Sequence, residues 1–113
     1  MACYKAKEMS AETLEYFRGR WPDPEVPAGE AEYYLCEISR ERDAVIRTVD
    51  LYSDGRVTRN SIDIEQRNGD HCPSLWDCSL ADGFTDADLI EISQNECEEY
   101  WRRGIDEPFW FAR

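Results

Sequence analysis

The chain has 113 residues, 42% of them hydrophobic, which is enough for one packed domain and argues against wholesale disorder. Its 25 acidic and 13 basic residues give a net charge of −12, which argues against nucleic acid or an anionic membrane as the main ligand. No apolar run approaches the roughly 20 residues of a membrane span, and the charged first residues do not resemble a secretory signal. We therefore expect a cytoplasmic protein.

The negative charge is concentrated in the second half of the chain. Residues 1–60 carry 12 acidic and 9 basic side chains, whereas residues 61–113 carry 13 acidic and 4 basic ones. Between Asp70 and Glu99 there is no Lys or Arg. Self-repulsion in such a stretch is relieved when counter-ions or a basic partner bind to it. The stretch is therefore either an ordinary acidic surface or a surface for a basic protein partner.

The first third of the chain is predicted to hold a short helix and an extended loop. Within residues 10–20, Ser10 can cap a helix and Gly19 can end it. Leu14 and Phe17 are three residues apart, which would place them on one helical face. Three prolines within residues 22–27 exclude both a helix and a central strand, so this segment is predicted to be an extended loop.

The middle of the chain is typical of an antiparallel meander. Residues 32–38 and 44–52 are rich in β-branched and aromatic side chains and are predicted to be strands. Ser53-Asp54-Gly55 predicts the turn between the second strand and a returning strand at 56–62, which is expected to continue towards Ile64. Alternation predicts that one face of the second strand carries Val45, Arg47, Val49 and Leu51.

The last third is predicted to contain a long connection, a short strand and a helix. Residues 65–83 hold several turn signals and at most a weak strand, and residues 88–92 can form a short strand. Ser93 and Glu96 form a capping box, so a helix is expected from Gln94 until Gly104 ends it. We therefore predict a single α+β domain over residues 1–113. The domain is expected to have an antiparallel sheet of three to five strands, a short N-terminal helix and a C-terminal helix that packs on one face of the sheet. The aromatic tail, residues 105–113, is expected to dock on the sheet, and residues 1–9 are a candidate flexible end.

The cysteine pattern indicates reduced thiols and no clear cofactor site. The chain has five cysteines, an odd number, and Cys36 and Cys97 lie in periodic segments that favour buried, hydrophobic roles. A zinc ion could be bound by His71, Cys72 and Cys78, but their spacing contains no C-x2-C pair and the chain offers no second ligand pair. Whether these residues bind a metal therefore stays open, and no cofactor is predicted. Neighbouring residues of an extended chain point to opposite sides, so His71 and Cys72 do not form a ready catalytic dyad. We predict no enzyme.

Several motifs together resemble a family of small bacterial proteins of unknown function. The motifs are the Trp21 to Glu25 segment, the Tyr34-Leu35…Glu37-Ile38 strand, the Arg47 to Val57 hairpin with Asp54-Gly55-Arg56, and Glu91-Ile92-Ser93…Glu96…Tyr100-Trp101. The resemblance spans about residues 21–103. These motifs comprise a turn, a cap and core aromatics, and members of the family are similar in size and style to immunity proteins encoded beside bacterial toxins. The resemblance implies partner binding and no catalysis.

The charge distribution and this resemblance favour a small binding protein, in its most specific form an immunity or inhibitor protein that blocks the basic cleft of a toxin. An adaptor for another cellular protein is one alternative, and a small enzyme with an acidic or metal-assisted site is another. A homodimer through a strand edge is compatible with all three. Acidic residues would select a basic partner and aromatic residues would anchor it. The candidate partner-binding residues are Asp70, Trp76, Asp77, Asp82, Asp86, Asp88, Glu98 and Tyr100.

Overall fold

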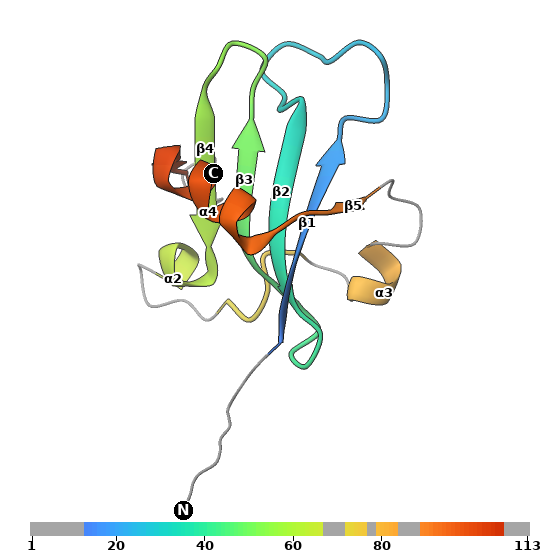
Figure 1. Cartoon of the computed structure of the whole chain (residues 1–113), viewed down its shortest axis with the longest axis vertical. Coiled ribbons are helices and arrows are strands. Elements are labelled where there is room, and N and C mark those ends of the chain that lie inside the picture. Colours follow the sequence, from blue (N-terminus) through green and yellow to red (C-terminus); the bar gives the residue numbers. More distant parts are fainter. Residues whose placement is uncertain (1–12, 67–71, 77–78, 84–88, 108–113) are drawn as a thin grey trace, which may run out of the picture.

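The structure, a computed structural model, describes residues 13–66, 72–76, 79–83 and 89–107. Its centre is a six-stranded sheet with the order β5-β1-β2-β3-β4-β6 (Figure 1). Four consecutive antiparallel strands form the meander: β1 Leu14–Arg20, β2 Tyr33–Ser39, β3 Ala44–Leu51 and β4 Val57–Ser61. The predicted strands at 32–38 and 44–52 are therefore confirmed to within about one residue.

Two short edge strands extend this meander, one within the predicted strand at 88–92 and one at 105–106 that was not predicted. β5, Ile90–Glu91, pairs antiparallel with β1, and β6, Ile105–Asp106, pairs parallel with β4. The sheet therefore has six strands and is mixed, whereas three to five antiparallel strands were predicted. A strand of two residues is too short to show alternation, and the parallel pairing arises only because the preceding helix returns the chain beside β4.

The helix predicted within residues 10–20 is wrong over residues 14–20, which form β1, and residues 10–12 lie outside the described residues. β1 is paired on both sides, because Phe17 lies opposite Cys36 of β2 and opposite Glu91 of β5. These two ladders supply backbone hydrogen bonds along the strand. The weak helical signal of Leu14 and Phe17 is outweighed by this tertiary pairing.

Three helices are present in the described residues: α2 Ile62–Glu65, α3 Leu80–Gly83 and α4 Gln94–Arg103. α2 replaces the predicted end of the returning strand, because Ser61 Oγ accepts a hydrogen bond of 3.0 Å from the Ile64 amide and starts a turn. α4 lies where the sequence predicted it. Ser93 Oγ accepts a hydrogen bond of 3.1 Å from the Glu96 amide, and Gly104 follows the last turn.

A β-bulge in β3 divides the core between the two faces of the sheet. Ile38 lies opposite Val45 but Glu37 lies opposite Arg47, so Ile46 is an extra residue at this point. Because side chains alternate along a strand, the extra residue moves Val45 to the face opposite Val49. The prediction that Val45 shares a face with Arg47, Val49 and Leu51 is therefore wrong.

Each face of the sheet carries its own apolar cluster. On the first, which we call the α4 face, Leu35, Val49 and Val57 are buried beneath Tyr100 and Trp101 of α4. Figure 1 shows α4 lying across this face. On the opposite face, a cluster that includes Cys36, Ile38 and Val45 is covered by Leu75 and Leu80 from the connection before β5. The described helices include none long and apolar enough to cross a membrane.

Candidate functional site

An arginine with two carboxylate partners lies on the α4 face. The Arg47 guanidinium donates two hydrogen bonds to Glu37 of β2, at 3.0 and 2.8 Å, and two to Glu98 of α4, at 3.2 and 2.7 Å. The exposed fractions of the Arg47 and Glu37 side chains are only 16% and 7%. Tyr16 adds a hydrogen bond to Glu37. Since Glu98 belongs to α4, this group ties the helix to the sheet.

The tryptophan of α4 packs over two arginines of the sheet. The guanidinium carbons of Arg47 and Arg59 lie 4.6 and 4.7 Å from the centre of the Trp101 ring. Arg59 also donates a hydrogen bond of 2.8 Å to Asp106 of β6 and another of 2.8 Å to the Trp101 carbonyl oxygen. The second arginine therefore fixes the end of α4 and the following edge strand.

The ionisation of the groups around Arg47 follows from their contacts. Hydrogen bonds from Arg47 lower the pKa of Glu98, although partial burial opposes this change. Burial by itself would lower the pKa of Arg47, but its hydrogen bonds to Glu98 and Glu37 outweigh burial and raise it. Burial, with the hydrogen bond to Glu37, raises the pKa of Tyr16 to about 12. All these groups keep one charge state near neutral pH, so the arrangement is suited to holding structure and not to moving protons.

Four of the eight candidate partner-binding residues lie in the described part of the chain. Asp82 is exposed in α3, and Trp76 packs partly buried against the cluster on the opposite face. Glu98 is bound to Arg47, and Tyr100 packs partly buried against the cluster on the α4 face. The structure therefore does not gather these four side chains into one patch. The others, which lie outside the described residues, are Asp70, Asp77, Asp86 and Asp88.

Arg47 is the residue whose role the sequence analysis missed. The sequence did contain a signal for this role, because Arg47 alternates with Val49 and Leu51 along a predicted apolar face. A buried arginine on such a face needs a carboxylate partner. The identity of that partner was not readable from the sequence. Glu37 and Glu98 are separated from Arg47 by 10 and 51 residues, and only strand pairing and helix packing bring them together.

The arginines of the described residues are largely neutralised by nearby carboxylates. Seven of them form ion pairs: Arg18, Arg20, Arg40, Arg47, Arg56, Arg59 and Arg102. Within the same part of the chain, Asp82 of α3 and Glu91 of β5 are exposed and have no arginine partner. Most of these arginines thus pair with carboxylates of the same chain, whereas Asp82 and Glu91 face solvent without an arginine among the described residues.

Cys36 and Cys97 are free thiols. Cys36 and Cys97 are buried, as predicted, with exposed fractions of 0% and 1%. Burial raises the pKa of Cys36 to about 12 and that of Cys97 to about 11, which makes both poor nucleophiles at neutral pH. Among residues 13–66, 72–76, 79–83 and 89–107, no group of three metal-binding side chains is assembled. His71 and Cys78 lie outside these ranges.

Comparison of the chain with known protein families, curated proteins and solved structures gives no match.

Proposed function

We propose that this protein binds a basic protein partner through carboxylates of the segment 70–99, and that in its most specific form it is an immunity or inhibitor protein for a toxin with a basic cleft. Its mechanism would be occlusion, in which carboxylates fill the cleft where an anionic substrate normally sits. The single observation that carries the proposal is the distribution of charge. The chain has a net charge of −12, and the arginines of the described residues are largely paired within the fold.

This charge distribution favours a cationic partner for a physical reason. A surface whose carboxylates lack local cations attracts positive charge over about one Debye length, roughly 8 Å in physiological salt. Asp82 and Glu91 present such carboxylates from α3 and β5. Trp76 and Tyr100 are partly exposed aromatic side chains of the same segment, and they pack on the clusters of opposite sheet faces.

The test measures binding to the protein encoded by the neighbouring gene, with two variants of equal charge. The first variant converts four carboxylates of the acidic segment to amides: Asp77→Asn, Asp82→Asn, Asp86→Asn and Asp88→Asn. The matched control converts four exposed carboxylates elsewhere: Asp23→Asn, Glu25→Gln, Glu30→Gln and Asp63→Asn. Both variants lose four negative charges, so a difference between them reports the location of the charge and not its total.

We expect the wild-type protein to associate more slowly as salt rises. The first variant should bind at least about tenfold more weakly, and the control within about threefold of wild type. Equal binding by all three proteins would show that the electrostatic mechanism is wrong. Coexpression then tests the inhibitor role, because an immunity protein restores the growth of cells that produce the partner. Binding without restored growth would instead favour the adaptor alternative.

A further inference from the structure

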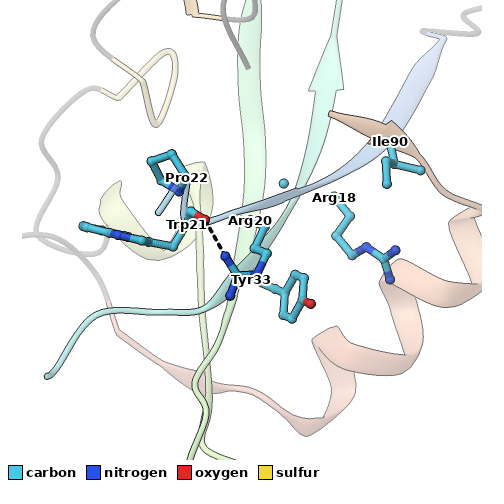
Figure 2. Close-up of a pocket in the computed structure, with 7 residues that line it drawn as sticks. Arg18, Arg20, Trp21, Pro22, Tyr33 and Ile90 are labelled. Atoms are coloured by element: carbon cyan, nitrogen blue, oxygen red, sulfur yellow. Dashed lines mark hydrogen bonds between the residues drawn. The ribbon is translucent and has the colours of Figure 1, made fainter. Parts of the chain in front are cut away.

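A pocket lined by two arginines, each paired with a carboxylate, lies on the α4 face of this acidic protein, at the end of β1. Its volume is about 400 Å³, within the range of sites for small ligands. Arg18 and Arg20 of β1 line it together with Tyr33 of β2, Pro22 and Ile90. Figure 2 shows the side chains of Arg18, Arg20 and Tyr33 on the same side of the strands, with Ile90 beyond Arg18 and the Trp21 ring directed away.

Strand register explains why two arginines and a tyrosine meet here. Arg20 lies directly opposite Tyr33, and Arg18 lies opposite Leu35, so all of these side chains share one face. The guanidinium carbons of Arg18 and Arg20 are each 5.8 Å from the centre of the Tyr33 ring. The ring thus lies within cation–π distance of both positive groups.

The two arginines differ in how firmly they are held. Arg20 Nη1 donates hydrogen bonds of 2.9 and 3.0 Å to the carbonyl oxygens of Trp21 and Asp23, which fixes its position. Arg18 is held by an ion pair with Glu96, at 3.7 Å, and by its contact with the Tyr33 ring. The Arg18 side chain is 39% exposed, so its guanidinium can offer hydrogen bonds to a ligand that enters the pocket.

We propose that this pocket binds a singly charged carboxylate carried on an apolar group. The guanidinium of Arg18 matches a carboxylate in shape and charge, while Tyr33, Pro22 and the 57% exposed Ile90 offer apolar surface beside it. A net charge of −12 disfavours a doubly charged phosphate more strongly than a monoanion. The carboxylate can belong to a small acid or to the end of a polypeptide, and the inference does not depend on the proposed function.

The first experiment is an NMR titration of the isotope-labelled protein with N-acetylphenylalanine, N-acetylleucine and N-acetylphenylalanine amide. Saturable shifts at Arg18, Tyr33 and Ile90 are expected with the two acids, and binding of the amide should be at least about tenfold weaker. The absence of saturable shifts with both acids up to about 10 mM would overturn the proposal, because a millimolar site would be filled there. Equal binding of acid and amide would also overturn it.

A pair of variants tests the role assigned to Arg18. Arg18→Gln should weaken binding of the acid at least about tenfold. Arg56→Gln is the matched control, because Arg56 also has a carboxylate at 3.7 Å and lies 4.1 Å from a tyrosine ring centre. Since Arg56 does not line the pocket, this variant should bind the acid within about twofold of wild type. If Arg18→Gln binds like the control, Arg18 is not the carboxylate ligand and the proposal fails.

Two further probes define the ligand class. Phenyl phosphate should bind more weakly than N-acetylphenylalanine, and tighter binding of the phosphate would contradict the preference for a monoanion. A tetrapeptide ending in phenylalanine with a free carboxylate separates the two sources. Tighter binding of the peptide than of N-acetylphenylalanine supports the end of a polypeptide, whereas equal affinity supports a small carboxylic acid.

Discussion

Removal of the Arg47 guanidinium should destabilise the fold severely. In Arg47→Met, Glu37 keeps its 7% exposure but loses its cation, and Glu98 loses the bond that ties α4 to the sheet. Breaking a buried ion pair by removing one partner costs roughly 3–5 kcal/mol, and we expect about 3 kcal/mol because Glu98 is one-third exposed. For a chain of this size, that loss lowers the melting temperature by about 12 °C.

The assay is urea unfolding followed by tryptophan fluorescence, with the free energy of unfolding taken from midpoints at constant m-value. Arg56→Met is the control, because its ion pair with Asp54 is exposed and should contribute less than about 0.5 kcal/mol. The triple variant Glu37→Gln, Arg47→Met, Glu98→Gln should recover most of the loss, since no uncompensated charge is left. A cost below about 1 kcal/mol for Arg47→Met would refute this reasoning.

Three further predictions concern other parts of the fold. Burial and two nearby carboxylates raise the pKa of Asp50 from 3.8 to about 6, so the folded protein binds the Asp50 proton more tightly than the unfolded chain does, and wild-type stability should fall as pH rises from about 4 to about 6. In urea unfolding at several pH values, Asp50→Asn should lose this fall and be up to about 3 kcal/mol more stable than wild type at pH 7. Gly19→Ala places a Cβ against the Tyr34 ring and should cost about 1–3 kcal/mol by thermal unfolding. The cost should be less than about 0.5 kcal/mol in a Tyr34→Ala background, and equal costs in both backgrounds would contradict the clash. Ser93→Ala removes the acceptor of the Glu96 amide and should cost about 1 kcal/mol, with faster hydrogen exchange confined to the first turn of α4 if the cap acts locally.

The sequence was most informative where a few adjacent residues decide the local structure. The meander strands are recognisable from their β-branched and aromatic residues, and Gly55 at the hairpin turn has a φ of +91°, a conformation that favours glycine. Ser93 and Glu96 likewise predict the start of α4, because a cap depends on neighbours in the chain. These are short-range effects, so no knowledge of the tertiary structure was needed.

Local sequence was misleading where pairing with a distant strand decides between two local structures. The spacing of Leu14 and Phe17 fits one helical face, yet pairing with β2 and β5 makes this segment a strand. The bulge at Ile46 has no turn residue to mark it, and it places Val45 and Val49 on opposite faces. In both cases a partner strand, distant in the sequence, decides the outcome.

The sequence by itself determined the α+β class, the meander, the C-terminal helix and the excess of negative charge. Only the tertiary structure decided which charges meet, because ion pairing depends on distance in space and not on separation along the chain. Arg47 meets Glu37 and Glu98 through strand register and helix packing, and Arg18 and Arg20 reach the Tyr33 ring because β1 pairs with β2. The same type of side chain therefore stabilises the fold at Arg47 and lines a pocket at Arg18 and Arg20.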